Sequence, residues 1–266
     1  MSLWYEETFQ ASYGEITPQG YPRLAVILSW LQEAALGHSH TRGFSVDDIK
    51  SKGITWVLSR ITVQFERMPV ADEQILVRTW PVTRESRSGI RDFELYDQCG
   101  KRIATATSLW VLLNLATRRP VKINEYLPEY PLNPVRALDD PFDPLPALGE
   151  NAPFNVQIPV LRSHIDQNAH VNNTVYATLA LEVVPDSVID TAVPDKIEIG
   201  FRAEAAYGDS ISVAGTLVKE GEGWRVVHRL SALPDGRELT RVVTHWTVMP
   251  TIAHAVQKMV APSVCV

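Results

Sequence analysis

Apolar side chains recur at helical spacing in two separate stretches of the chain. The first stretch runs from Pro22, which suits a first helical turn, to Gly37, which suits a C-terminal cap. The second begins near Asn172 and ends before Pro185. Both patterns predict an amphipathic helix with one buried face. The apolar positions are Leu24, Leu28, Leu31 and Ala35 in the first stretch and Tyr176, Leu179, Ala180 and Val183 in the second.

Each helical stretch precedes several runs that are rich in β-branched and aromatic residues and are separated by turn residues. These runs predict strands near 54–67, 74–83, 90–97, 102–115, 196–204, 210–219, 224–233 and 238–249. A helix followed by a meander of antiparallel strands thus occurs twice, which indicates duplication of one α+β unit. Because one helix can cover the apolar face of one sheet, we expect two sheets, each wrapped around its own helix.

The stretch 131–153 is rich in proline and has little hydrophobic periodicity. Such a composition is typical of a linker that crosses the protein surface. We therefore predict an N-terminal domain at 1–135, a linker at 136–153 and a C-terminal domain at 154–266.

The composition is that of an ordinary globular protein, since 45% of the 266 residues are hydrophobic and 21% are charged. No apolar run reaches the roughly 18 to 20 residues that a membrane span needs. The first residues also lack the basic-then-apolar order of a secretory signal. We expect no membrane span and a cytoplasmic location. The net charge of −6 argues against nucleic-acid binding, which requires a basic surface.

Two local groups of basic residues are exceptions to the negative net charge of the chain. They could bind an acidic partner, or they could be two solvated turns, and the sequence favours neither interpretation. The groups are Arg84, Arg87 and Arg91, and Arg118, Arg119 and Lys122.

The segment before the second helix carries an acid, an amide and an imidazole at alternate positions, Asp166, Asn168 and His170. In extended backbone, side chains two residues apart point the same way, so these three could converge. The helix start that follows adds free backbone N–H groups and a partial positive charge. This combination suits the polarisation of a carbonyl group. Asp and Asn are also common capping and turn residues, which is the structural alternative.

Glu204 is a second candidate acid, and it falls in an otherwise apolar predicted strand. An unpaired carboxylate is costly in such a place. Glu204 is therefore either paired with Arg202 or another neighbour, or retained for function. The first half has no Asp-x-Asn-x-His segment before its helix, so we expect one active site per chain.

The run Asp166–Asn173, with Tyr176 and the segment Phe201–Glu204, resembles the acyl-acyl-carrier-protein thioesterase family. The resemblance covers at least residues 20–125 and 155–215. It implies two tandem hotdog domains, in which an antiparallel β-sheet wraps around a long central α-helix. First-half segments that also match are Lys52–Arg60, Thr79–Pro81, Arg91–Phe93, Ser108–Asn114 and Thr117–Pro120.

The resemblance also implies an activity, the hydrolysis of fatty acyl-acyl-carrier-protein thioesters to free fatty acid and carrier protein, with no cofactor or metal. It assigns acyl-chain specificity to the N-terminal domain and catalysis to the C-terminal one. The catalytic residues would be Asp166, Asn168, His170 and Glu204. Plant members carry a cysteine directly after this glutamate, where the chain has Ala205, so we expect attack by water.

The acidic carrier protein would meet a basic surface at Arg84, Arg87, Arg118 and Arg119. Two other functions fit the same residues, namely an acyl-CoA thioesterase with the same site and a hotdog protein that binds acyl groups without hydrolysing them. A homodimer is left open, because an internal duplication already supplies the pairing that single hotdog domains obtain by dimerising.

Overall fold

The computed structural model of the protein describes residues 3–149 and 152–249. The first half contains β1 (Tyr5–Phe9), α1 (Leu24–Thr41), α2 (Val46–Ser51), β2 (Ile54–Phe65), β3 (Ile75–Pro81), β4 (Ser88–Tyr96), β5 (Arg102–Asn114) and α3 (Ile123–Tyr126). The second half contains β6 (Phe154–Pro159), α4 (Asn173–Leu181), α5 (Asp186–Ile189), β7 (Ala192–Phe201), β8 (Ser210–Glu220), β9 (Gly223–Leu233) and β10 (Glu238–Val248). Within these described residues, no helix combines the length and apolar character needed to cross a membrane.

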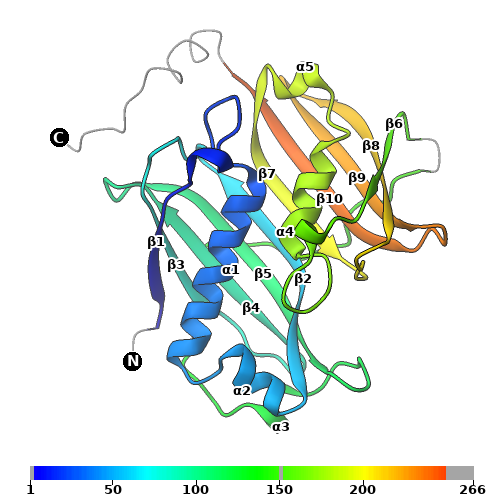
Figure 1. The fold of residues 1–266 in the computed structure, drawn as a ribbon. Coiled ribbons are helices and arrows are strands. Elements are labelled where there is room, and N and C mark those ends of the chain that lie inside the picture. Colours follow the sequence, from blue (N-terminus) through cyan, green and yellow to red (C-terminus); the bar gives the residue numbers. More distant parts are fainter. Residues whose placement is uncertain (1–2, 150–151, 250–266) are drawn as a thin grey trace.

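The strands form one antiparallel sheet in the order β1-β3-β4-β5-β2-β7-β10-β9-β8-β6. The two halves meet where β2 pairs with β7, with Arg60 opposite Gly200 and Gln64 opposite Lys196. Helix α1 lies across the first half of this sheet and α4 across the second (Figure 1). The predicted arrangement of two antiparallel sheets around two helices is confirmed, and the two sheets are continuous at the β2–β7 pair.

The main hydrophobic core contains residues from both halves. Leu28 and Leu31 of α1 belong to the same buried cluster as Tyr176 of α4 and the paired Ile61 and Ile199 of β2 and β7. The two helices also contact each other. The duplicated units therefore share one apolar interior, and neither half buries its helix alone.

Strands β1 and β6 form the two outer edges of the sheet, pairing with β3 and β8. Both are short, and intermediate and exposed positions alternate along them. The sequence pattern did not predict them, because five or six half-exposed residues carry too weak a signal.

The first helix does not end at Gly37 as predicted, because α1 continues to Thr41. A Cβ atom added at Gly37 would lie 2.7 Å from the Tyr5 hydroxyl oxygen, so the glycine allows β1 to approach the helix closely. Pro22 lies just before the N-cap residue, Arg23, and not in the first turn.

The proline-rich stretch has no helix or strand between α3 and β6 among its described residues, and it is held on the sheet. Arg60 donates to the Asp143 carbonyl (2.7 Å) and Arg241 to the Leu145 carbonyl (2.8 Å). Leu145 and Leu148 are buried in a cluster with residues of β8, β9 and β10. The stretch is thus attached along its length, and the domain limits stay a prediction.

Replacing Ile199 with alanine tests whether the two halves share one core. Ile199 is 0% exposed, and we expect I199A to lower the free energy of unfolding by about 2–5 kcal/mol in a single transition. Urea unfolding followed by circular dichroism measures this. Val218→Ala is the control, because Val218 is 38% exposed and should change the free energy by less than about 0.5 kcal/mol. Two separate transitions would contradict a shared core.

Candidate active site

Residues 166–170 form a closed turn directly before α4. The Asp166 N–H donates to the His170 carbonyl (3.0 Å), and the Ala169 N–H donates to the Asp166 carbonyl (3.0 Å). Ile165 and Val171 pair across the base of the turn, and Ala169 has a φ of 64°. The expectation that Asp166, Asn168 and His170 alternate along extended backbone is therefore wrong, because the chain reverses between them.

The same turn occurs before α1 in the first half. There the Thr17 N–H donates to the Tyr21 carbonyl (2.8 Å), the Gly20 N–H donates to the Thr17 carbonyl (2.9 Å), and Ile16 pairs with Pro22. Gly20, with a φ of 90°, stands where the second copy has Ala169. The turn is thus part of the duplicated architecture.

The two copies of the turn differ in the chemistry of their side chains. Thr17, Gln19 and Tyr21 occupy the positions of Asp166, Asn168 and His170. Because the first copy closes with a different set of side chains, the acid, amide and imidazole of the second copy are not required to form the turn. This comparison favours a functional reason for them over the capping alternative.

Asp166 and Asn168 contact each other within the turn. The Asn168 backbone N–H donates to Asp166 Oδ1 (2.7 Å), and the Asn168 amide nitrogen lies 3.5 Å from Asp166 Oδ2. Lys50, at the end of α2 in the first half, donates from Nζ to Asn168 Oδ1 (3.0 Å). The orientation of the Asn168 amide is therefore fixed from two sides.

Glu204 lies beyond the end of β7, which stops at Phe201, and not inside a strand as predicted. Its Oε2 atom lies 3.3 Å from His170 Nε2 and accepts a hydrogen bond from Arg118 of the first half. This bond raises the pKa of Arg118. Arg202, the partner considered from the sequence, pairs with Glu238 instead.

Two backbone contacts at Ala205 hold Glu204 beside the turn. The Val171 N–H donates to the Ala205 carbonyl (2.8 Å), and the Ala205 N–H donates to the Tyr176 hydroxyl (3.2 Å). Tyr176 is 2% exposed on α4, and burial raises its pKa to about 12. The hydroxyl therefore stays neutral and can accept this bond across the whole physiological range of pH.

Helix α4 begins at the site. Asn172 is the N-cap residue, and its side chain accepts from the Thr174 N–H (2.9 Å). The Asn173 N–H donates to no acceptor in the part of the chain that the structure describes. Asn173 also lines the cavity described next.

A cavity of about 690 Å³ connects the four candidate residues, Asp166, Asn168, His170 and Glu204, with the first half of the protein. Its other walls come from α1, α2, β2, β4 and β5 and include Leu36, Ile49, Trp56, Leu58, Ile90 and Trp110. His170 and Glu204 pair directly, as do Asp166 and Asn168, and both pairs face this one space.

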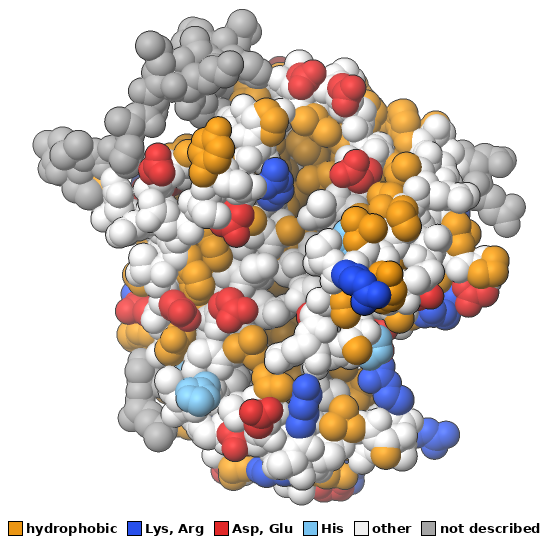
Figure 2. All heavy atoms as spheres, viewed as in Figure 1, with side chains coloured by type: hydrophobic (Ala, Val, Ile, Leu, Met, Phe, Trp, Pro, Cys, Tyr) orange, Lys and Arg blue, Asp and Glu red, His pale blue; other side chains and the backbone are white. Residues whose placement is uncertain are grey.

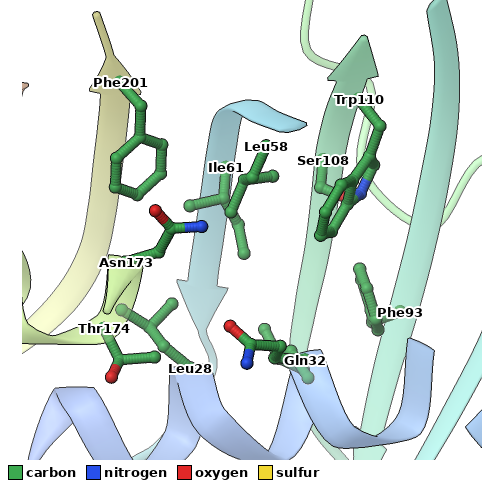
Figure 3. A pocket seen from close by; sticks show the side chains of 11 residues that line it. Leu28, Gln32, Leu58, Ile61, Phe93, Ser108, Trp110, Asn173, Thr174 and Phe201 are labelled. Atoms are coloured by element: carbon green, nitrogen blue, oxygen red, sulfur yellow. The ribbon is translucent and has the colours of Figure 1, made fainter. Parts of the chain in front are cut away.

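A smaller apolar pocket of about 20 Å³ lies beside the cavity between α1 and the sheet. Gln32, Leu58, Trp110 and Asn173 line both spaces. Figure 3 shows these side chains pointing toward one another from α1, α4 and the strands. Leu28 and Leu31, which the sequence placed on the apolar face of the first helix, line the smaller pocket.

The predicted basic surface is only partly present. Arg87 and Arg119 are exposed, and Figure 2 shows Lys and Arg side chains at the lower right of the drawn face, around the part of the first half that carries α2. Arg84 donates to the Pro128 carbonyl (2.6 Å), and Arg118 bonds Glu204. Arg91, grouped with Arg84 and Arg87 from the sequence, lies within β4 and lines the cavity, so it does not belong to a solvated turn.

The sequence did not reveal that Lys50 and Arg118 belong to the site. They lie 118 and 86 positions from their partners, Asn168 and Glu204. Neither has a local spacing that marks it, and only the pairing of β2 with β7 brings the two halves together. The match of Thr117–Pro120 to a known pattern was the one available signal for Arg118.

Two family models match the chain. The model of the acyl-ACP thioesterase N-terminal domain matches residues 2–130, and the model of the acyl-ACP thioesterase C-terminal domain matches residues 150–248.

Similar proteins cover nearly the whole chain. It is 27% identical to the Arabidopsis thaliana oleoyl-acyl carrier protein thioesterase 1, with 94% of the chain and 77% of the relative covered. It is 25% identical to the Cuphea viscosissima acyl-[acyl-carrier-protein] hydrolase FATB2, with 92% of the chain and 63% of the relative covered. A solved structure of an acyl-ACP thioesterase from Bacteroides thetaiotaomicron is 25% identical, covers 93% of this chain and 100% of its own, and superposes with a TM-score of 0.80. The likeness confirms the fold of two tandem hotdog domains.

Replacing Ala169 with glycine tests the backbone strain in the second turn. A non-glycine residue in the left-handed region costs about 1–2 kcal/mol, so A169G should raise the free energy of unfolding by about 0.5–1 kcal/mol. Ala116→Gly is the control, because Ala116 is exposed and does not have a positive φ, and this change should lower stability. Guanidinium unfolding compares the two variants. Equal losses of stability would show that the turn is not strained at Ala169.

Proposed function

The chain belongs to the acyl-ACP thioesterase family, and from this membership and the geometry of the site we propose that it hydrolyses fatty acyl-carrier-protein thioesters by direct attack of water. The observation that carries this proposal is the His170–Glu204 pair, 3.3 Å apart, in the wall of a cavity of about 690 Å³. A thioester bond placed at this pair has its acyl chain in the apolar part of the cavity.

Glu204 and His170 together accept the proton of the attacking water. Proton transfer to a positioned base contributes typically 10² to 10⁴-fold to a rate. Arg118 holds the Glu204 carboxylate in place, and the backbone bonds of Ala205 fix the segment on which it stands. A cysteine nucleophile is excluded at the position after Glu204, because Ala205 has no reactive atom.

The N-terminal end of α4 stabilises the negative oxygen that forms on the carbonyl group. Asn173, the first residue of α4, lines the cavity, so its N–H and the partial positive charge of the helix end are available there. A donor of this kind is worth about 10² to 10³ in rate, because it matters most when the charge develops. The Asn168 amide, held by Asp166 and Lys50, orients the water or the thioester.

Asp166 acts through Asn168 in this arrangement. Both of its carboxylate oxygens lie within 3.5 Å of Asn168 nitrogen atoms, and no hydrogen bond joins it to the His170 side chain within residues 3–149 and 152–249. Of the two acids, Glu204 is therefore the better candidate for the base.

The acyl chain occupies the first half of the protein. Each buried methylene contributes about 0.8 kcal/mol, so the depth of the cavity between α1 and the sheet sets the preferred chain length. Such an apolar wall would also suit a protein that only binds acyl groups. The paired His170 and Glu204 favour an enzyme over that alternative.

The basic residues Arg87 and Arg119 receive the acidic carrier protein. They stand on two loops that bond the same end of β5, since the Leu112 N–H donates to the Arg87 carbonyl and the Asn114 N–H to the Arg119 carbonyl, both at 3.0 Å. Arg119 is next to Arg118, which lines the cavity. A carrier bound here would therefore present its thioester to the site.

Replacing Glu204 with glutamine, or His170 with alanine, should lower kcat by about 10² to 10⁴-fold, because each change removes one partner of the base. Steady-state hydrolysis of a carrier-linked acyl series, from octanoyl to hexadecanoyl, measures the effect. Glu222→Gln is the matched control, since Glu222 is exposed in the turn between β8 and β9, and it should keep full activity. Undiminished hydrolysis in both site variants would refute the proposed site.

Charge reversal at the two exposed arginines separates the carrier from coenzyme A as the substrate. The double variant Arg87→Glu, Arg119→Glu should lower kcat/KM for carrier-linked acyl groups by about 10-fold or more at low salt, because steering by opposite charges is lost. Turnover of the same acyl group on coenzyme A should change far less. An equal effect on both substrates, or none on either, would contradict docking at these residues.

A further inference from the structure

The cavity is also lined by a positively charged group, Arg91, that is far from the proposed catalytic residues. Glu204 follows β7, whereas Arg91 lies on β4, and the sheet order places β2 and β5 between these two strands. Neighbouring strands are about 4.8 Å apart, so three intervals amount to about 14 Å. Both residues nevertheless line the same cavity. Arg91 therefore stands at the end that an acyl chain would reach last.

Arg91 is bonded only to neutral groups among the residues that the structure describes. Its Nη1 atom contacts His38 Nδ1 and Thr79 Oγ1, both at 3.2 Å. Burial first, and then the charge of Arg91, lower the pKa of His38 to about 3, so the imidazole is neutral and accepts the bond. The Nε and Nη2 atoms have no acceptor in residues 3–149 or 152–249.

No carboxylate compensates this cation within the described parts of the chain. Asp92, the next residue on β4, is 0% exposed and pairs with Arg136 (3.0 Å). Neighbouring residues of a strand face opposite sides of the sheet, which places this pair away from Arg91. Other arginines of the first half, such as Arg67 and Arg78, pair with glutamates. Arg91 is half-buried in the cavity wall and has no such partner, and a cation withdrawn from water without a counter-charge is costly.

The surroundings of Arg91 add positive charge. Arg42 and Arg84 lie over the Tyr130 ring, with their guanidinium carbons 5.7 and 5.1 Å from its centroid. Arg42 and Tyr130 also line the cavity and lie close enough to Arg91 to act on its charge. Burial lowers the pKa of Arg91 to about 10, so it stays charged at neutral pH. This end of the cavity therefore favours an anion.

We propose that Arg91 binds a carboxylate at the far end of the acyl chain, so that the preferred substrates are ω-carboxyacyl thioesters. The N–H groups on Nε and Nη2 of Arg91 can donate to the two oxygen atoms of one carboxylate. A lysine ammonium at this position could not form such a paired contact. The carrier protein stays at the opposite end, where Gln167, Asn168 and Arg118 are exposed. The inference rests on the proposed hydrolysis, because it names the substrate of that same site.

The test compares matched acyl groups on the carrier protein. Wild type should hydrolyse ω-carboxyundecanoyl carrier protein with a kcat/KM about 10-fold or more above that of dodecanoyl carrier protein, as expected for charged hydrogen bonds. Arg91→Met should abolish this preference and keep hydrolysis of the dodecanoyl group. Arg91→Lys should restore part of it. Arg102→Met is the control, since Arg102 is exposed and pairs with Glu66 away from the cavity, and it should leave the ratio unchanged.

A binding measurement separates failure of this inference from failure of the proposed function. Calorimetric titration with dodecanedioic and dodecanoic acid should show tighter binding of the diacid to wild type, and the difference should disappear in R91M. Hydrolysis of dodecanoyl carrier protein without any preference for the ω-carboxyl group would overturn the inference alone. Absence of hydrolysis on every thioester would overturn the proposed function, and the titrations would then decide the carboxylate site.

Discussion

The site depends on the backbone of Ala205. Its carbonyl accepts from the Val171 N–H and its N–H donates to the buried Tyr176 hydroxyl, so both of its polar groups are committed to the segment that starts α4. These two bonds bring the chain after β7 against the turn before α4 and place Glu204 3.3 Å from His170. Main-chain geometry therefore places the segment that carries Glu204 beside His170, and Arg118 then fixes the Glu204 carboxylate.

The sequence predicted the elements with strong periodicity and missed the weak ones. The two central helices and the eight long strands have clear patterns, whereas β1 and β6 are short and half-exposed. The grouping of Asp166, Asn168 and His170 was predicted from an extended backbone that the structure does not have. All three nevertheless line one cavity.

The contacts that could not be predicted from the sequence depend on the pairing of strands that are far apart in the chain. Lys50 and Arg118 reach Asn168 and Glu204 only because β2 pairs with β7 and joins the two halves edge to edge. Arg91 was grouped with exposed neighbours, since its position on a strand says nothing about which face of the sheet it takes. No local pattern distinguishes such residues from ordinary surface charges.

The continuous sheet has a consequence for how enzymes of this kind can change. The first half, in which we propose that the acyl group is held, supplies two contacts to candidate site residues of the other half, from Lys50 to Asn168 and from Arg118 to Glu204. If the first half were exchanged as a unit to alter the choice of fatty acid, the new half would need residues equivalent to Lys50 and Arg118. It would also have to pair with β7 in the same register as β2. Evolutionary changes in the choice of fatty acid are thus expected to change the rate of hydrolysis as well. Replacement of single residues in the cavity wall is therefore a more accessible route to a new choice of fatty acid than exchange of the whole first half.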